Sequence, residues 1–111
     1  MKIAGLLIAT AVLGAGTHVS AETPWPDAVA RIIAKRQSYP RSAEIRGDQG
    51  TTRVKIFCNS DGAIARVQLT QSSGSPILDR QAQEVIANIG RLPPPPEGVT
   101  TLLVPIVWRL N

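Results

Sequence analysis

Few side chains in this sequence are suited to catalysis or to metal binding. The 111-residue chain contains one histidine, His18, and one cysteine, Cys58. One cysteine cannot form a disulfide within the chain, and one thiolate is too few ligands for a metal site. Because His18 lies in an N-terminal segment that we expect to be removed, no histidine remains to activate a serine or cysteine nucleophile. We therefore expect no metal ion and no cofactor.

The sequence does not predict an enzyme. It lacks the glycine-rich GxxxxGKS/T and GxGxxG patterns of nucleotide-binding loops. A small hydrolase would need a carboxylate to activate Ser72, Ser73 or Ser75, and Ser75 is better explained as the N-cap of a helix that begins at Pro76. These observations favour a protein that binds other proteins over one that converts a small-molecule substrate.

The excess of basic residues is small and dispersed. The formal net charge is +4 at pH 7, from 12 Lys and Arg against 8 Asp and Glu. No run of basic residues forms the continuous positive patch of a nucleic-acid-binding surface, and one Phe, one Tyr and two Trp offer few rings for base stacking. Nucleic acid is therefore not an expected partner.

The first 21 residues have the pattern of a secretory signal peptide. Lys2 precedes an apolar run from Ile3 to Gly16, and small residues follow up to Ala21. A helix of this run alone would be about 21 Å long, shorter than the roughly 30 Å hydrocarbon core of a bilayer. We expect cleavage after Ala21 and an exported domain at residues 22–111. An uncleaved segment would instead tether the domain to the inner membrane.

Two short helices are predicted at the start of the exported domain. Pro26 opens a pattern in which Val29, Ile32 and Ile33 recur with helical spacing, and the pattern ends before Pro40. A second short helix is expected from Pro40 to about Arg46.

A strand pair follows the two helices. Residues 52–58 alternate between apolar and polar side chains, and Asp61-Gly62 is a strong hairpin signal. The partner strand is expected at residues 64–69. Because Ile64 is out of phase with the apolar residues after it, we expect a bulge at residues 65–66.

The main helix and the last strand complete the predicted elements. Apolar residues recur with helical spacing between Ser75, the expected N-cap, and Gly90, which ends the helix. Four prolines at 93–96 form an extended connector, and residues 101–110 alternate as one long strand. The predicted fold class is α+β. It is a two-layer sandwich of a three-stranded antiparallel sheet, in the order strand–strand–helix–strand, packed by one main helix and preceded by N-terminal helices.

These elements resemble the C-terminal domain of the TonB family, which is related to the TolA C-terminal domain. The resemblance covers about residues 25–110 and rests on motifs that occur in the family's order. They are Tyr39-Pro40, Gly50, Asp61-Gly62, Ser72-Ser73-Gly74 with Leu78-Asp79, the prolines at 93–96 and Val104-Pro105-Ile106.

The resemblance implies a periplasmic module that serves TonB-dependent transmembrane transport. Such domains dock a short extended segment of an outer-membrane receptor by strand addition at the exposed edge of the last strand. If the last strand pairs only with the first, one of its edges is open, and another backbone can satisfy its unpaired N–H and C=O groups. The partner-binding residues expected from this reading are Leu103, Pro105, Val107, Arg109, Tyr39 and Pro40.

Three departures limit the resemblance. The family's long proline-rich spacer is absent from residues 22–24, so the sequence supports receptor binding better than energy transduction. Only Tyr39-Pro40 remains of the family's Gln-Pro-x-Tyr-Pro segment. Pro105 removes one backbone donor, either from the internal ladder or from the open edge, and guarding the edge against aggregation is an alternative role for it.

Other strand residues are assigned by phase. Cys58 is in phase with Val54, so a buried core thiol is favoured over a redox or ligand role. Trp108 is in phase with Val104, which favours core packing over peptide contact. An outward-facing Leu103 and Val107 are either a binding surface or are covered by the helix at 26–37.

A second functional hypothesis keeps the envelope location without receptor docking. The domain would then be a structural or regulatory protein. It would self-pair edge to edge as a homodimer, or it would compete with a full-length transducer for receptors.

Overall fold

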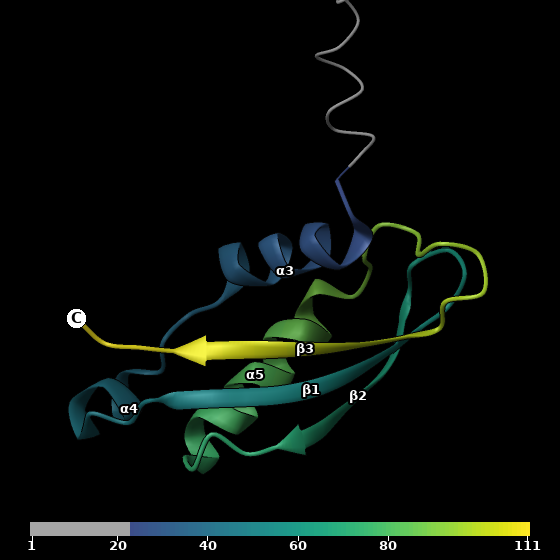
Figure 1. The fold of residues 1–111 in the computed structure, drawn as a ribbon. Helices are drawn as coiled ribbons and strands as arrows, with labels where there is room; N and C mark the ends of the chain where they lie inside the picture. The colour runs from purple at the N-terminus through teal and green to yellow at the C-terminus, as the bar shows by residue number, and fades with distance from the viewer. Residues whose placement is uncertain (1–22) are drawn as a thin grey trace, which may run out of the picture.

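The computed structural model describes residues 23–111, in which three antiparallel strands and three helices form the α+β arrangement predicted from the sequence (Figure 1). In chain order the elements are α3 (Trp25–Arg36), α4 (Arg41–Arg46), β1 (Gly50–Cys58), β2 (Ile64–Gln71), α5 (Pro76–Ile89) and β3 (Thr101–Trp108). The strand order is β2-β1-β3, so the first strand is central and the last strand lies at an edge. The predicted edge position of the last strand is confirmed.

Helix α5 crosses one face of the sheet (Figure 1) and supplies four buried apolar residues to the core on that side, Leu78, Ala82, Val85 and Ile86. The helix begins where the sequence predicts, because the Ser75 hydroxyl accepts a hydrogen bond from the Leu78 amide at 3.3 Å and Pro76 occupies the first turn. The Gly90 amide closes the other end by donating to the Ile86 carbonyl at 3.4 Å. The apolar stripe of α5 is buried against the sheet, and this contact fixes which face of the sheet is turned to the core.

The two N-terminal helices both pack against α5, and α3 also runs beside β3 (Figure 1). Val29 and Ile33 of α3 are buried, and α3 contacts both α5 and β3. Helix α4 begins after Pro40 and ends at Gly47, whose φ of 75° is left-handed and suits a glycine. Both helices lie within one residue of their predicted starts.

The β1–β2 hairpin contains the predicted bulge and one more. Phe57 pairs with Arg66 and Cys58 pairs with Ile64, which leaves Ala65 as the extra residue. A second register shift beside Val54 leaves Thr70 without a partner residue. The two bulges make β2 an irregular strand.

The hairpin turn needs a glycine at position 62. Gly62 has a φ of 93°, and a Cβ there would lie 2.0 Å from the Leu92 carbonyl oxygen. The Leu92 amide donates to the Gly62 carbonyl at 2.8 Å, so the connector before β3 is tied directly to the turn. The Asp61-Gly62 signal therefore marks a close backbone approach as well as a turn.

Strand β3 is two residues shorter than predicted, because it ends at Trp108. The predicted core positions are confirmed: the Trp108 side chain is 2% exposed, and Cys58 is buried as a free thiol. Burial raises the pKa of the Cys58 thiol, which disfavours the reactive thiolate form.

The expected signal peptide lies outside the described residues. Within residues 23–111, no helix has the length and hydropathy that a membrane span would need.

Candidate functional site

The outer edge of β3 is the most regular strand edge in the described part of the chain. All eight residues of β3 pair with β1 without a register shift, from Thr101 opposite Phe57 to Trp108 opposite Gly50. The other edge strand, β2, is interrupted by its two bulges. Because bulges disturb the spacing of N–H and C=O groups, β3 is the better template for an added strand.

The backbone groups of β3 divide into an inward and an outward set. The Thr100 carbonyl accepts from the Cys58 amide at 2.9 Å, so it points toward β1. At the other end, the Leu110 amide donates to Gln49 Oε1 at 2.7 Å, also on the β1 side. The backbone N–H and C=O groups of successive residues in a strand point in opposite directions. Those of even-numbered residues in β3 therefore point toward β1, and those of odd-numbered residues point toward the outer edge. The outward set is therefore Thr101, Leu103, Pro105 and Val107.

This alternation decides which donor Pro105 removes. Pro105 lies opposite Arg53 in the β1–β3 ladder, and it belongs to the outward set. The internal ladder therefore loses no hydrogen bond. The missing N–H is a gap in the middle of the outer edge, between the outward amides of Leu103 and Val107.

A side chain from outside the sheet is hydrogen-bonded to this edge. The Gln37 Nε2 donates to the Val107 carbonyl at 2.8 Å, from the segment that links α3 to α4. Among the described residues no strand pairs with the outer edge. Within residues 23–111 no strand therefore covers Thr101–Pro105, while helix α3 contacts β3 and the Gln37 side chain is bonded near its end.

Three of the four side chains of the outward set are exposed, and Thr101 is half-buried. Leu103 is 67% exposed and Val107 is 48% exposed, while Pro105 and Arg109 are also exposed. Helix α3 does not cover Leu103 and Val107, because its buried residues pack with the core on the other side of the sheet. The alternative in which that helix covers them is therefore wrong.

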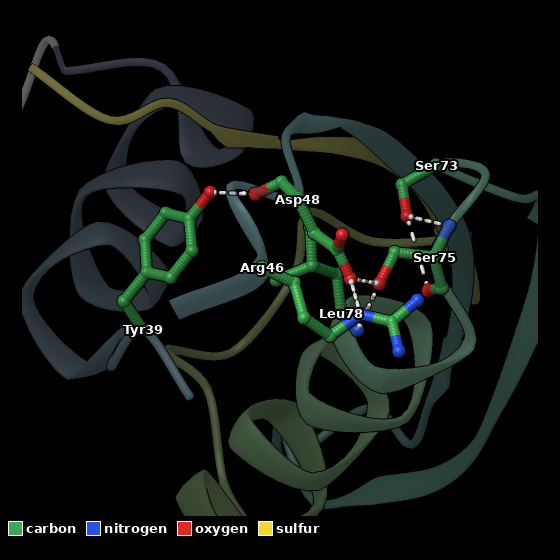
Figure 2. Close-up of polar contacts among 6 residues, drawn as sticks. All are labelled: Tyr39, Arg46, Asp48, Ser73, Ser75 and Leu78. Atoms are coloured by element: carbon green, nitrogen blue, oxygen red, sulfur yellow. Dashed lines mark hydrogen bonds and ion pairs between the residues drawn. The ribbon is translucent and has the colours of Figure 1, made fainter. Parts of the chain in front are cut away.

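Tyr39 and Pro40 lie near the C-terminal end of β3 and have structural contacts. The Tyr39 ring meets the Trp108 ring edge-to-face, with centroids 5.4 Å apart and an interplanar angle of 84°. Its hydroxyl donates to the Asp48 carbonyl, as Figure 2 shows. Burial, followed by the charges of Asp48 and Glu44, raises the pKa of the Tyr39 hydroxyl, which keeps it a donor. Pro40 is the N-cap residue of α4.

A hydrogen bond and an ion pair to Asp48 connect the end of α4 with the start of α5. The Ser75 hydroxyl donates to Asp48 Oδ2 at 2.9 Å, and Arg46 Nε lies 3.3 Å from the same oxygen (Figure 2). Ser75 therefore caps α5 and holds the loop before β1 at the same time. This double contact explains the buried serine without a catalytic role.

A buried carboxylate, Asp79, organises the sheet, and the sequence indicated it only as part of the family motif Leu78-Asp79. Asp79 Oδ1 accepts from Thr52 Oγ1 at 3.0 Å and from the Ser73 amide and hydroxyl, both at 2.8 Å, while Ser72 Oγ donates to Oδ2. Trp108 Nε1 in turn donates to Thr52 Oγ1 at 3.2 Å, which extends the network to β3. Burial raises the pKa of Asp79, but these hydrogen bonds lower it by more, so it stays charged.

A separate groove of about 520 Å³ lies between β2 and α5. Its walls include Leu69, Arg80 and Glu84. It is on the β2 side of the sheet, away from the β3 edge. Asp79 also lines the groove, but none of the predicted partner-binding residues does.

The sequence match extends over most of the described residues. Residues 35–110 match the family described as Gram-negative bacterial TonB protein C-terminal. The chain belongs to the TonB C-terminal domain family. Protein TonB of Pseudomonas putida is 34% identical over 92 residues, which is 78% of this chain and 38% of that protein. The chain therefore spans well under half the length of this TonB relative.

Solved structures agree with the family. The solution structure of the Helicobacter pylori TonB C-terminal domain has a TM-score of 0.70 and 27% sequence identity, covering 96% of this chain and 98% of that one. TolAIII bound to a peptide derived from the N-terminus of TolB has a TM-score of 0.65, with 99% of this chain and 82% of that one covered. At 17% identity the second likeness establishes the fold alone. The family resemblance and the fold class predicted from the sequence are both confirmed.

Proposed function

We propose that this TonB-like domain docks an extended segment of an outer-membrane receptor by strand addition at the outer edge of β3, in the periplasm. The observation that carries the proposal is the unbulged eight-residue edge strand whose outward amides at Leu103 and Val107 have no backbone partner among residues 23–111. An added strand would supply carbonyls to these amides and accept from the outward carbonyls. This role needs no catalytic group.

The side chains along the edge suit such a partner. Leu103 and Val107 present apolar surface on either side of Pro105, and alternate residues of an added strand would lie beside them. The TolA domain of the same fold, whose solved complex contains a TolB peptide, is consistent with peptide docking on this architecture. Energy transduction is not part of the proposal, which concerns docking only.

Self-pairing of two β3 edges is the less favoured alternative. An antiparallel pair centred on Pro105 would have no backbone donor at its middle from either copy. The geometry therefore favours a different chain as the added strand.

The proposal is tested with a synthetic peptide of the TonB box, the short extended segment of an outer-membrane receptor that TonB C-terminal domains dock, taken from a receptor of the source organism. Two versions carry one N-methyl group each, at adjacent residues in the centre of the peptide. In an added strand, adjacent N–H groups point in opposite directions, so one methyl group faces β3 and the other faces solvent.

The expected result is asymmetric. One methylated peptide should bind at least about fivefold more weakly than the parent, because a backbone hydrogen bond is worth about 1 kcal/mol net. The other should bind like the parent peptide. Isothermal titration calorimetry gives both affinities, and equal affinities of the two methylated peptides would contradict strand addition.

A further inference from the structure

The face of the sheet turned away from α5 has a one-sided charge. The three strands contain no Asp or Glu, and their charged residues are Arg53, Lys55 and Arg66. Arg53 and Lys55 alternate with the buried residues of β1, and Arg66 pairs with Phe57 in the same phase. All three cations therefore lie on the face that α5 does not cover, which we call the open face (Figure 1).

These cations differ in the contacts they make. Arg66 lies 4.1 Å and Lys55 Nζ 5.2 Å from the centre of the Phe57 ring, so both have a cation–π partner. The ion pairs among residues 23–111 are Arg46–Asp48 and Arg91–Asp61, and neither includes a sheet residue. Arg53 is exposed and has neither a ring nor a carboxylate as partner among the described residues.

Arg53 lies on the central strand β1, at the same level as the missing N–H in the outer edge of β3. It is the direct cross-strand neighbour of Pro105, whose outward N–H is missing. A strand added beyond β3 would lie roughly 5 Å from β3 and roughly 10 Å from β1. The compact ring of Pro105 is the only side chain between Arg53 and the partner residue at that level, so the long arginine side chain can extend across it.

Backbone pairing is weakest at the same point. The partner residue beside Pro105 finds no amide donor for its carbonyl. A side-chain contact is then what distinguishes one partner residue from another at this level. A guanidinium recognises a carboxylate best, because two parallel N–H groups can bind its two oxygens.

We propose that Arg53 is a specificity residue that binds an acidic side chain of the docked segment, at the partner position beside Pro105 on the open face. This inference rests on the proposed strand addition and adds to it the chemistry of the partner. Leu103 and Val107 on either side of Pro105 match apolar partner residues, so the expected segment has an acidic residue between apolar ones on this face.

The test moves one glutamate along the TonB-box peptide, one residue at a time, and compares each peptide with its glutamine version. Affinities are measured at low and at high salt for the wild-type domain and for Arg53→Gln and Arg66→Gln. The matched control is Arg66→Gln, because it removes a cation from the same face at a site remote from β3.

At one peptide position the glutamate version is expected to bind the wild-type domain about fivefold more tightly than the glutamine version. The ratio should fall to about one in Arg53→Gln and persist in Arg66→Gln, and it should decrease at high salt. Equal reductions in both variants would indicate general attraction by the open face and would overturn the assignment to Arg53.

Other outcomes separate this inference from the proposed function. If the peptides shift the NMR signals of β3 but no glutamate position depends on Arg53, the specificity assignment is wrong and strand addition stands. If no peptide shifts β3, the proposed function itself is wrong. Vesicles containing phosphatidylglycerol form the last arm: vesicle binding that is lost in Arg53→Gln would overturn the assignment to a protein carboxylate.

Discussion

Replacing Trp108 with alanine is expected to lower the free energy of unfolding by about 4 kcal/mol, the range for deleting a large buried aromatic side chain. Trp108 is the largest fully buried side chain of the described core. The change also removes the edge-to-face contact with Tyr39 and the hydrogen bond to Thr52. Because small domains have a total stability of roughly 5–15 kcal/mol, the variant should be close to unfolding at room temperature. Chemical denaturation followed by circular dichroism measures the loss.

The other tryptophan provides the control for this prediction. Trp25 is only half-buried at the start of α3, where its Nε1 donates to the Pro93 carbonyl at 2.8 Å. We expect Trp25→Ala to cost about 1–2 kcal/mol, from one hydrogen bond and partial burial. The placement of Trp108 at the centre of the core would be wrong if both alanine variants lost the same stability.

Asp79→Ala is expected to lower the free energy of unfolding by about 3 kcal/mol, because it leaves buried donors unpaired. The affected donors are the Thr52 and Ser73 hydroxyls and the Ser73 amide, all bonded to Oδ1, and the Ser72 hydroxyl, bonded to Oδ2. The matched control is Asp61→Ala, which removes an exposed carboxylate paired with Arg91 and should cost much less stability. Thermal denaturation of the two variants tests the difference.

The network around Asp79 also predicts how acid affects stability. The pKa of Asp79 in the folded protein lies below its ordinary value of 3.8. Its contribution to stability is therefore fully present above the unfolded pKa and is lost as the pH falls through the folded pKa. We expect the free energy of unfolding of the wild type to decrease below about pH 4, and Asp79→Asn to show a shallower decrease. Equal slopes for the two proteins would contradict a charged, hydrogen-bonded Asp79.

The secondary structure was predictable because its signals are local. The Ser75-Pro76 start of α5, the Gly62 turn and the alternation in β1 each depend on neighbouring residues. The bulge at Ala65 was visible as a change of phase after Ile64. The second bulge, at Thr70, leaves no such change in the sequence, because it lies at the end of the strand where few apolar residues remain to define a phase.

The details of the candidate site depend on contacts between distant segments. The sequence left open which donor Pro105 removes, since the answer requires the pairing of Thr100 with Cys58. The Gln37 contact with Val107 joins residues 70 positions apart, and only the adjacent Tyr39-Pro40 motif hints that this segment lies near β3. Arg53 was recognisable as an outward-facing cation, but its position opposite Pro105 comes from the register of β1 and β3.

The central role of Asp79 in the buried hydrogen-bond network was not predicted from the sequence for a related reason. Asp79 in the first turn of α5 has an ordinary explanation as a favourable charge at a helix start. Its burial depends on Thr52 and Trp108, which the fold brings together from β1 and β3. The run Ser72-Ser73 before the helix was the available signal, because two hydroxyls near one carboxylate suit a buried acceptor.

The most direct measurement of strand addition at β3 is amide hydrogen exchange of the domain saturated with the TonB-box peptide. The outward amides of Leu103 and Val107 should exchange much more slowly in the complex, because the added strand accepts from them. The amides of Leu102 and Val104 face β1 and should change little. Unchanged exchange at Leu103 and Val107, or protection confined to β2, would contradict the account.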